Sequence, residues 1–330
     1  MSGNAGSTLL ASVTRRLAMG LNETAGRLVQ SFGQFYRTTS DLMRDGAHMI
    51  EHRDGIHVLW EIPPDGLGTR PGKPVTSRYR PSVAEATMSG RRWDRDEAFD
   101  PEMLEHVREA ASASIRKMRS TDGGTNIYKS EAGENYDGLF HFRPYRGAQT
   151  DREVAAYRLD EALGFGRIPP TARTNGVGGP DPHYTGPGMI QQFVESRPAE
   201  VITRYQKRQQ QQVAVLDYIM GNLDRRPANF RTVDRGNGTV DLLAIDHGRA
   251  FPESFDSLAV PMKSDFLAEW AREGKDLDPD VLAAVDRVDV DRLRVALLDA
   301  GLSENATTGA LHRLEHLRAL RKVPPYIAHG

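Results

Sequence analysis

The chain has 330 residues, of which 38% are hydrophobic and 27% charged, and its formal net charge is -2. This composition is typical of a folded globular protein, and the balanced charge excludes an overall basic field for nucleic acid or an anionic membrane surface. The absence of cysteine excludes disulfides, thiolate metal sites and cysteine nucleophiles, and it favours a cytosolic protein.

The N-terminal stretch has a helical pattern. Apolar residues at helical spacing predict an amphipathic helix over 9–44. Charged residues interrupt this stretch, so it lacks the apolar core of a secretory signal. No window of the chain approaches the apolar length that a membrane-spanning helix needs, so membrane insertion is not expected.

A loop-rich stretch follows. Residues 56–62 form a short apolar run that predicts a strand, whereas 63–95 is rich in Pro, Gly, Arg and Ser and is interpreted as a surface loop. Asp100 is a suitable N-cap and Pro101 a suitable first helical residue, so a helix is predicted from there to Arg119.

The pattern then changes to short strands around one helix. Residues 125–131 and 139–144 are extended runs that predict a hairpin with a long loop. Residues 150–163 predict a helix, capped by Thr150 or Asp151 and ended at Gly164, and 189–195 predicts another strand. Together these elements predict a small α+β lobe.

The C-terminal half is predicted to be mostly helical. Apolar stripes predict helices over 200–221, 263–272, 279–288, 291–300 and 303–321. One hairpin interrupts them, because two apolar runs flank an Asn-Gly turn at 229–233 and 239–245.

Three oxygen-bearing side chains around this hairpin indicate phosphoryl transfer. That reaction needs a carboxylate to orient the attacking hydroxyl and oxygen ligands for Mg²⁺ on the nucleotide phosphates. Asp224 and Asn229 have the five-residue spacing that protein kinases use for these groups, and Asp246 directly follows the returning apolar strand. Gly248 is expected to allow a sharp turn after Asp246.

The same segments resemble a known group of proteins. GNLDRRPAN (221–229) and AIDHGRAF (244–251) are similar to the catalytic and metal-binding loops of the phosphatidylinositol 3-/4-kinase-like branch of the kinase fold. That branch includes the HipA-type (HipA-like) toxin kinases and the Golgi casein kinases, and the nearest resemblance is to actinobacterial members. IYKSEAGE (127–134) and the stretches 152–171 and 186–195 resemble the nucleotide-binding lobe of this branch in the same order.

The resemblance implies roles for further residues. Lys129 matches the strand lysine that meets the nucleotide phosphates, and Glu153 matches the helix glutamate that pairs with it. Gln192, Phe193, Val194 and Glu195 match the hinge whose backbone meets adenine. Asp224 matches the catalytic-loop aspartate, with Asn229 and Asp246 as metal ligands. Independently of the resemblance, Arg143 is a second candidate cation for the phosphates.

Two positions depart from the pattern of this branch. Ser130 follows the strand lysine where Pro is frequent, and Arg226 stands two residues after Asp224, where His or Lys is frequent. Arg226 remains a candidate catalytic residue, but its guanidinium is bulkier and permanently charged. Both departures keep open the alternative of a nucleotide-binding pseudokinase that acts as an interaction module.

Each candidate also has a purely structural interpretation. Asp224 could cap the turn before Pro227, and Lys129 and Glu153 could form an ordinary surface ion pair. His247 could orient Asp246 or pack beneath the loop. The combination and order of Asp224, Asn229 and Asp246 favour the functional interpretation.

The predicted fold is α+β and two-lobed, like a protein kinase. A helical N-terminal extension with a Pro/Gly/Arg-rich loop (1–120) precedes a β-rich N-lobe (121–196) and a helical C-lobe (197–330). The predicted function is an ATP- and Mg²⁺-dependent phosphotransferase, or kinase. It would transfer the γ-phosphate to a hydroxyl of a protein, peptide or small molecule; adenylate transfer is a further alternative. Nucleic acid is not expected as a partner because of the chain's overall charge. A protein, peptide or small-molecule acceptor is favoured over a lipid, because the chain has no basic amphipathic surface for docking on a membrane.

Overall fold

The computed structural model describes part of the chain and divides it into two compact units. The described residues are 48–53, 56–61, 79–100, 115–135, 141–142, 144–180, 185–253, 261–272, 275–324 and 327–328. The first unit comprises Met1–Gly68 and Leu139–Pro144, and the second comprises Thr69–Gly138 and Tyr145–Gly330. The helix expected over 9–44 lies outside the described residues.

The first unit contains one antiparallel hairpin. β1 (His48–Arg53) pairs with β2 (Ile56–Glu61) in a register that runs from His48 opposite Glu61 to Arg53 opposite Ile56. The strand predicted over 56–62 is therefore confirmed.

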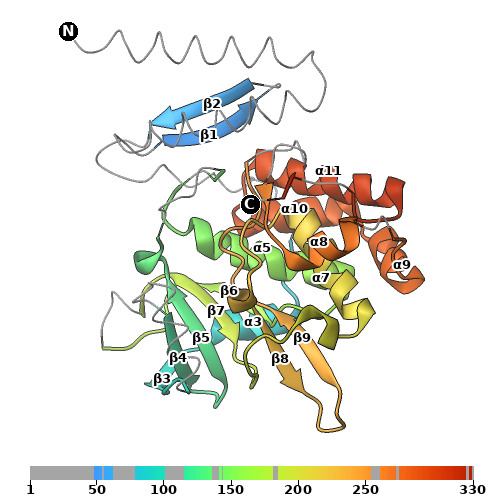
Figure 1. The fold of residues 1–330 in the computed structure, drawn as a ribbon. Coiled ribbons are helices and arrows are strands. Elements are labelled where there is room, and N and C mark those ends of the chain that lie inside the picture. Colours follow the sequence, from blue (N-terminus) through green and yellow to red (C-terminus); the bar gives the residue numbers. More distant parts are fainter. Residues whose placement is uncertain are drawn as a thin grey trace, which may run out of the picture. The chain divides into compact units, whose positions relative to one another are not determined.

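The second unit contains an antiparallel five-stranded sheet in the order β3-β4-β5-β7-β6 (Figure 1). Its strands are β3 (Trp93–Asp96), β4 (Ile115–Ser120), β5 (Thr125–Ser130), β6 (Thr171–Thr174) and β7 (Gly188–Gln192). Side chains of a strand alternate between the two faces of its sheet. One face packs on helix α3 (Val83–Gly90) through a cluster that includes Met88, Tyr128 and Ile190. The opposite face is thereby left for the candidate site.

The prediction of a helix from Asp100 to Arg119 is wrong over 115–119, where β4 lies, and residues 101–114 lie outside the described part of the chain. A tight turn joins β4 to β5, and Gly123 in it has a φ of 84°, which glycine adopts without a steric penalty. This turn lets β4 bury Met118 on the α3 face, so hairpin pairing replaces the helix over these residues.

Two further expectations for this region are wrong. Within the stretch 63–95, read as a loop, Ser82 caps α3 by accepting the Glu85 N–H at 3.1 Å, and β3 begins at Trp93. The hairpin between 125–131 and 139–144 does not form, because β5 pairs with β4 and β7 instead.

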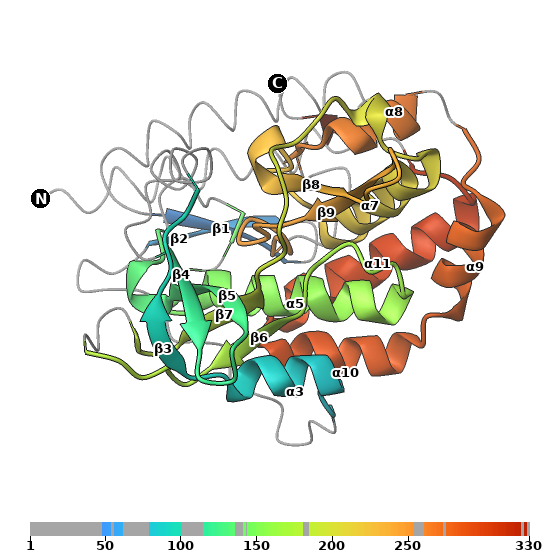
Figure 2. The same ribbon diagram turned by 90° about the horizontal axis from the view of Figure 1, so that it is seen from below.

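Helix α5 (Ala148–Leu163) lies between the sheet and the C-terminal helices (Figure 2). It confirms the helix predicted over 150–163, and Gly164 ends it in the left-handed conformation, with a φ of 67°. Its cap differs from the expectation of Thr150 or Asp151. Glu134 accepts the N–H groups of Gly147, Gln149 and Thr150 at 2.7–3.2 Å, so a side chain from before the helix neutralises its N-terminus.

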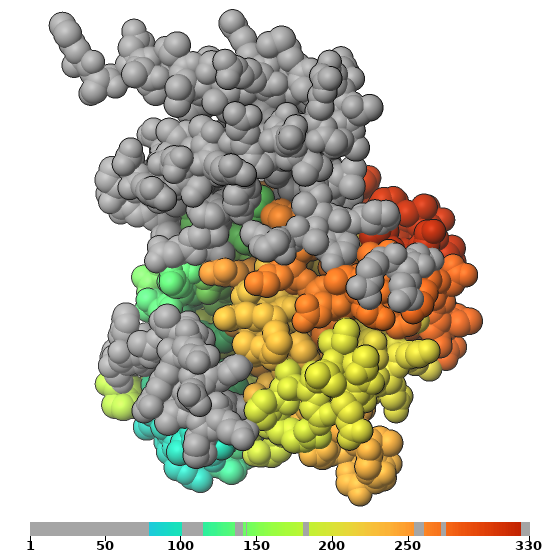
Figure 3. Space-filling model, viewed as in Figure 1, coloured from blue at the N-terminus to red at the C-terminus, as the bar shows by residue number. Residues whose placement is uncertain are grey.

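The C-terminal part is a helical lobe with one hairpin. Its elements are α7 (Lys207–Met220), β8 (Phe230–Asp234), β9 (Val240–Ala244), β10 (Pro261–Met262), α8 (Asp265–Arg272), α9 (Pro279–Arg287), α10 (Val290–Ala300), α11 (Glu304–Leu320) and β11 (Ile327–Ala328). Residues of this lobe, coloured yellow to red, form most of the coloured surface in Figure 3. One large apolar cluster joins α5, the hairpin and these helices. The predicted α+β fold with a β-rich and a helical lobe is confirmed.

Two details of this lobe differ from expectation. The helix expected from residue 200 begins only at Lys207, after a 3-10 turn at Ile202–Arg204. Glutamine is usually exposed, but the four glutamines at 209–212 are all buried, because α7 packs at the centre of the lobe. The predicted N-lobe begins at residue 121, but β3 and β4, which precede that residue, belong to the same sheet. The predicted domain boundaries are not otherwise tested and stay predictions.

We predict that Gly188→Ala destabilises the fold by about 1–3 kcal/mol, the range for forcing extra atoms into a packed site. A Cβ at residue 188 would collide with the carbonyl oxygen of Lys129 and lie 2.9 Å from Ser130 Cα. Both are backbone atoms of the paired strand, so neither can move aside. Urea-induced unfolding measures the change.

Gly90→Ala is the matched control, because a Cβ there meets no atom within 4 Å. It should leave the free energy of unfolding unchanged or slightly higher, since Ala favours a helix over Gly. Equal stabilities of the two variants would contradict the close packing of β7 on β5.

Candidate active site

A cleft between the sheet and the predicted catalytic loop (221–229) holds most of the predicted site residues. Its empty volume is about 950 Å³, part of which is open to solvent, within the usual range for small-molecule sites. Its lining residues are Phe99, Ile115, Ile127, Lys129, Pro169, Gln191, Gln192, Phe193, Val194, Ser196, Arg226, Ala228, Asn229, Arg231, Leu243, Ile245 and Asp246. Just over half of these residues are apolar, and the polar ones include the cations Lys129, Arg226 and Arg231 and the carboxylate Asp246.

Strand alternation explains why Lys129 faces the cleft. Along β5, Tyr128 is buried against α3, so its neighbours Ile127 and Lys129 point to the other face. In the β5–β7 register, Ile127 lies opposite Gln191 and Lys129 opposite Met189. Ser130, in place of the Pro frequent in this branch, ends the strand without turning Lys129 out of the cleft.

Lys129 joins both walls of the cleft through two carboxylates. Its Nζ lies 2.8 Å from Glu153 Oε1 on α5 and 3.0 Å from Asp246 Oδ1 after β9. Burial alone would lower the pKa of Lys129, but the charges of Asp246 and Glu153 outweigh it and hold the pKa above its usual value. The ammonium is therefore charged at neutral pH and positioned for anionic phosphates.

Glu153 is buried and contacts more than the lysine. Its Oε2 accepts the backbone N–H of His247 at 3.0 Å. Burial would raise the pKa of Glu153, but Lys129 and His247 hold it below its usual value. The His247 ring is itself fully buried, and this burial lowers its pKa, so the ring is neutral at neutral pH. The structure therefore places His247 beneath the loop.

The loop after α7, which is the predicted catalytic loop, is held by a buried ion pair. Asp217 on α7 and Arg225 in the loop have completely buried side chains, and their charged atoms lie 3.1 Å apart. Arg225 also donates to the carbonyl oxygens of Asn229 and Ile245, the latter at 2.8 Å. The residues before and after the β8–β9 hairpin are thus tied to one guanidinium.

The predicted catalytic-loop residues lie close together. Asn229 donates from Nδ2 to Asp224 Oδ2 at 3.3 Å, and Arg226 Nε lies 3.6 Å from Asp224 Oδ1. Asn229 is buried and lines the cleft, whereas Asp224 is not among the lining residues. Since the Asn229 nitrogen is directed to Asp224, its Oδ1 is the atom available to a metal ion.

The turn after β9 is made differently from the expectation. Asp246 itself is left-handed, with a φ of 57°, a conformation that Asp tolerates better than most residues. Gly248 is not among the positive-φ glycines; a Cβ there would instead approach Gln149 of α5 at 3.3 Å. Asp246 thus turns the chain, and Gly248 permits close packing on α5.

The predicted hinge is partly at the cleft. Gln192 donates its N–H to the Pro170 carbonyl at 2.9 Å, and Phe193 donates to Thr125 at 3.1 Å. Val194 lines the cleft beside them, whereas Glu195 does not. Three of the four predicted positions therefore border the volume that a nucleobase would occupy.

The donor set fits a phosphate-bound metal ion. Within the described ranges, no group of three or more His, Asp and Glu side chains suits a metal ion by itself. Mg²⁺ needs only one or two protein oxygens when phosphates and water complete its shell. Asn229 and Asp246 supply such a pair at one end of the cleft.

One predicted site residue lies outside the described residues, and three residues of the site were not predicted. Arg143 lies outside the described residues. Sequence reasoning missed Asp217, Arg225 and the cleft-lining Gln191. The identity and spacing of Asp217 and Arg225, on either side of a helix-ending glycine, were the available signal for the pair.

Comparison with known proteins finds similarity to kinases in the middle of the chain. Residues 151–271 match the family model described as Phosphatidylinositol 3- and 4-kinase. Phosphatidylinositol 4-kinase gamma 4 of Oryza sativa subsp. japonica is 29% identical over 163 residues, and the Arabidopsis thaliana protein of the same name is 32% identical over 131 residues. This part of the chain is a kinase-like domain.

The alignments cover 44% and 32% of this chain but 27% and 22% of the two relatives, so the chain spans about a quarter of their length. Among solved structures, the Golgi casein kinase has a TM-score of 0.47 and 15% identity, over 72% of this chain and 74% of that chain. The Helicobacter pylori kinase CtkA has a TM-score of 0.39 and 13% identity, over 72% and 95%. These structural similarities are too remote to assign a function.

For the buried pair, we expect Asp217→Asn to cost about 3–5 kcal/mol of unfolding free energy, because it leaves the buried Arg225 charge without a partner. The double variant Asp217→Asn with Arg225→Met should recover part of this loss, since it removes the orphaned charge. Guanidinium unfolding of the three proteins measures it. A loss below 1 kcal/mol for the single variant would show that the pair is not an essential support of the loop.

The contribution of Glu153 to stability should depend on pH. Its pKa is lower in the folded than in the unfolded chain, so its ion pair stabilises the fold above about pH 4.3, the ordinary Glu pKa, and this contribution is lost as the pH falls toward the folded value. The difference in unfolding free energy between wild type and Glu153→Gln should therefore shrink on acidification below about pH 5.

The control is Glu315→Gln, which removes an exposed carboxylate that pairs with Arg318 one helical turn away. Its effect should be small at every pH. If wild type and Glu153→Gln differ equally at neutral and acidic pH, the Lys129–Glu153 ion pair does not govern the acid sensitivity.

Proposed function

We propose that this chain is an ATP-dependent phosphotransferase that moves the γ-phosphate to a hydroxyl group. The main support for this function is that Lys129 contacts both Glu153 and Asp246 at the end of a cleft that Asn229 also lines. A cation held by two carboxylates from opposite walls is an arrangement suited to binding and neutralising phosphates. The match of residues 151–271 to a kinase family supports the same reaction.

Each side chain then has a defined task. Asp224 would orient the acceptor hydroxyl and take its proton. Arg226 has no lone pair with which to accept that proton, because its guanidinium stays charged, so its task is to attract phosphate charge beside Asp224. Asn229 and Asp246 would hold Mg²⁺, which supplies charge neutralisation on the phosphates. The apolar lining and the hinge backbone would hold the base.

The acceptor is proposed to be a hydroxyl of a protein, peptide or small molecule. The curated relatives are named phosphatidylinositol 4-kinases, which makes phosphatidylinositol the second candidate acceptor. Within the described helices, none is long and apolar enough to cross a membrane. The placement with HipA-type and actinobacterial members, and a cytosolic location, stay predictions.

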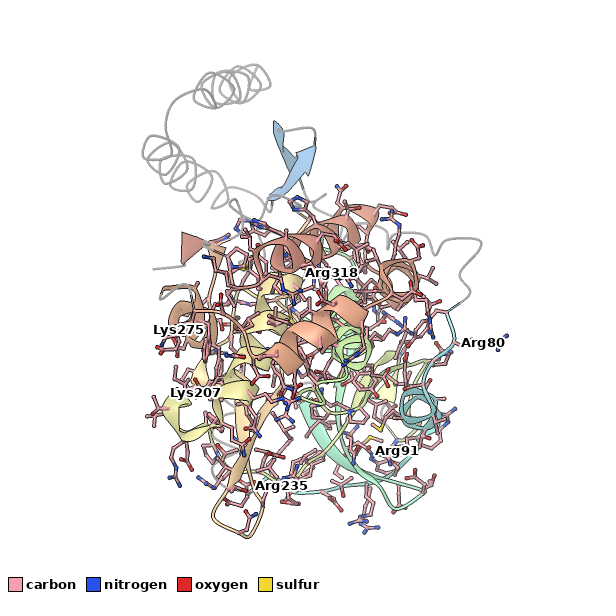
Figure 4. All side chains as sticks on the ribbon, turned by 90° about the vertical axis from the view of Figure 1, so that its right-hand side faces the viewer. Arg80, Arg91, Lys207, Arg235, Lys275 and Arg318 are labelled. Carbon is pink, nitrogen blue, oxygen red and sulfur yellow. The ribbon has the colours of Figure 1, made fainter. Side chains whose placement is uncertain are left out.

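Figure 4 bears on macromolecular partners. The labelled cations Arg80, Arg91, Lys207, Arg235, Lys275 and Arg318 come from six separate segments and are spread over the molecule. The formal net charge of -2 also provides no overall basic field that would attract a nucleic-acid backbone.

The test is ATP turnover in the presence of Mg²⁺ by wild type, Asp224→Asn and Asp246→Asn. Asn keeps the shape of each side chain and tolerates the left-handed backbone of Asp246. We expect Asp224→Asn to lose about 10²–10⁴-fold in turnover, the usual contribution of a positioned acid or base, and Asp246→Asn to lose most of its activity. Asp276→Asn, which changes an exposed carboxylate outside the cleft, should retain full turnover.

The assay has three acceptor arms: the protein itself, a mixture of serine- and threonine-containing peptides, and vesicles with phosphatidylinositol. Intact-mass analysis of the products separates phosphate from adenylate transfer. Binding of Mg-ATP without turnover in any arm would instead identify a pseudokinase. Turnover that survives both site variants would overturn the assigned roles.

A further inference from the structure

Gln191 is a buried polar side chain in the largely apolar part of the cleft. It lies on β7 directly before the hinge, opposite Ile127 on the cleft face of the sheet. Only 5% of the residue is exposed. Near it in the lining are apolar residues such as Ile127, Pro169 and Phe193. A buried amide in such surroundings is costly unless both of its ends find partners.

The hydrogen bonds of Thr171 fix which way this amide points. The Thr171 hydroxyl donates to the Pro169 carbonyl oxygen at 2.8 Å, so its single hydrogen is used. Towards Gln191 the hydroxyl can therefore only accept. Gln191 Nε2 donates to Thr171 Oγ1 at 2.8 Å. This chain of donors removes the usual ambiguity between the nitrogen and the oxygen of a glutamine amide.

The other end of the amide is a free acceptor. No donor from the described ranges reaches Gln191 Oε1, whose residue lines the cleft. The N–H of the next residue, Gln192, is directed away to Pro170. An acceptor without a partner, held rigidly in a ligand-sized cavity, is satisfied when the ligand brings a donor.

We propose that Gln191, oriented by Thr171, selects the nucleobase, accepting a hydrogen bond from an exocyclic amino group at the edge of a purine that faces the hinge strand. This inference rests on the proposed nucleotide-dependent function and narrows it to 6-amino purines. Guanine and hypoxanthine carry a carbonyl oxygen at the same position, which would face Oε1 as acceptor against acceptor. Loss of one neutral hydrogen bond corresponds to about tenfold in affinity, and an unpaired buried acceptor adds to that.

The experiment measures the affinity of the full chain for Mg-ATP, Mg-GTP and Mg-ITP by calorimetry. ITP has the 6-carbonyl of guanine without its 2-amino group, so it separates the acceptor clash from simple exclusion of the larger base. We expect ATP to bind at least about tenfold more tightly than both GTP and ITP. Tight binding of ITP would overturn the inference.

Two variants test the residues themselves. Gln191→Met keeps the length of the side chain without its acceptor and should bring the three affinities to within about threefold of one another. Thr171→Val removes the hydroxyl that fixes the amide, so the Gln191 amide can turn its nitrogen to a 6-carbonyl, and binding of GTP and ITP should rise relative to ATP.

Thr174→Val is the matched control. Thr174 lies on the same strand, β6, three residues further on, so its side chain faces away from the cleft, and its hydroxyl donates to the Gly176 carbonyl at 3.0 Å. It should keep the wild-type preference. Thermal unfolding of each variant establishes that it is folded.

The outcomes separate the two levels of the hypothesis. Equal affinities of wild type for ATP, GTP and ITP, or a preference that survives in both Gln191→Met and Thr171→Val, would overturn the role of Gln191 while the phosphotransferase stands. If wild type binds none of the three nucleotides, the proposed function itself fails, and the selection of a base fails with it.

Discussion

The buried ion pair between Asp217 and Arg225 is the constraint on which the site depends. Two charges taken out of water are expensive, and such a pair contributes little net stability by itself. Its value here is positional: Asp217 is anchored on α7 and also accepts from Ser264 Oγ at 2.7 Å, while Arg225 reaches the carbonyls of Asn229 and Ile245. The catalytic loop and the end of β9 are therefore held at a fixed separation.

A second frame, built on α5, supports the opposite wall. The helix packs on the sheet and on α10, and Glu134 satisfies its first N–H groups. Because the helix is held along its length, the carboxylate of Glu153 is held in a fixed position next to Lys129. Lys129 is thus positioned by packing within the protein and not by a ligand, as in a preorganised site.

Local signals in the sequence were sufficient for the parts of this site that depend on local structure. The β8–β9 hairpin has strong turn chemistry, so Asn229 and Asp246 were correctly expected at its two ends. The β3–β4 and β5–β7 pairings were missed because their partners are distant in the chain and their strands mix polar with apolar residues. The polar character of Gln191 and of the glutamines of α7 suggests that they are exposed to solvent, but tertiary packing buries them.

Glu153 binds one residue on each side of the cleft: Oε1 accepts from Lys129 of β5, and Oε2 accepts the His247 N–H beyond β9. A movement that separates β5 from the end of β9 has to break one of these bonds, because a single carboxylate cannot follow both partners. Widening of the cleft would therefore cost at least one hydrogen bond of this carboxylate. Under the proposed function, a nucleotide that needs a wider cleft in order to enter or leave has to break this junction.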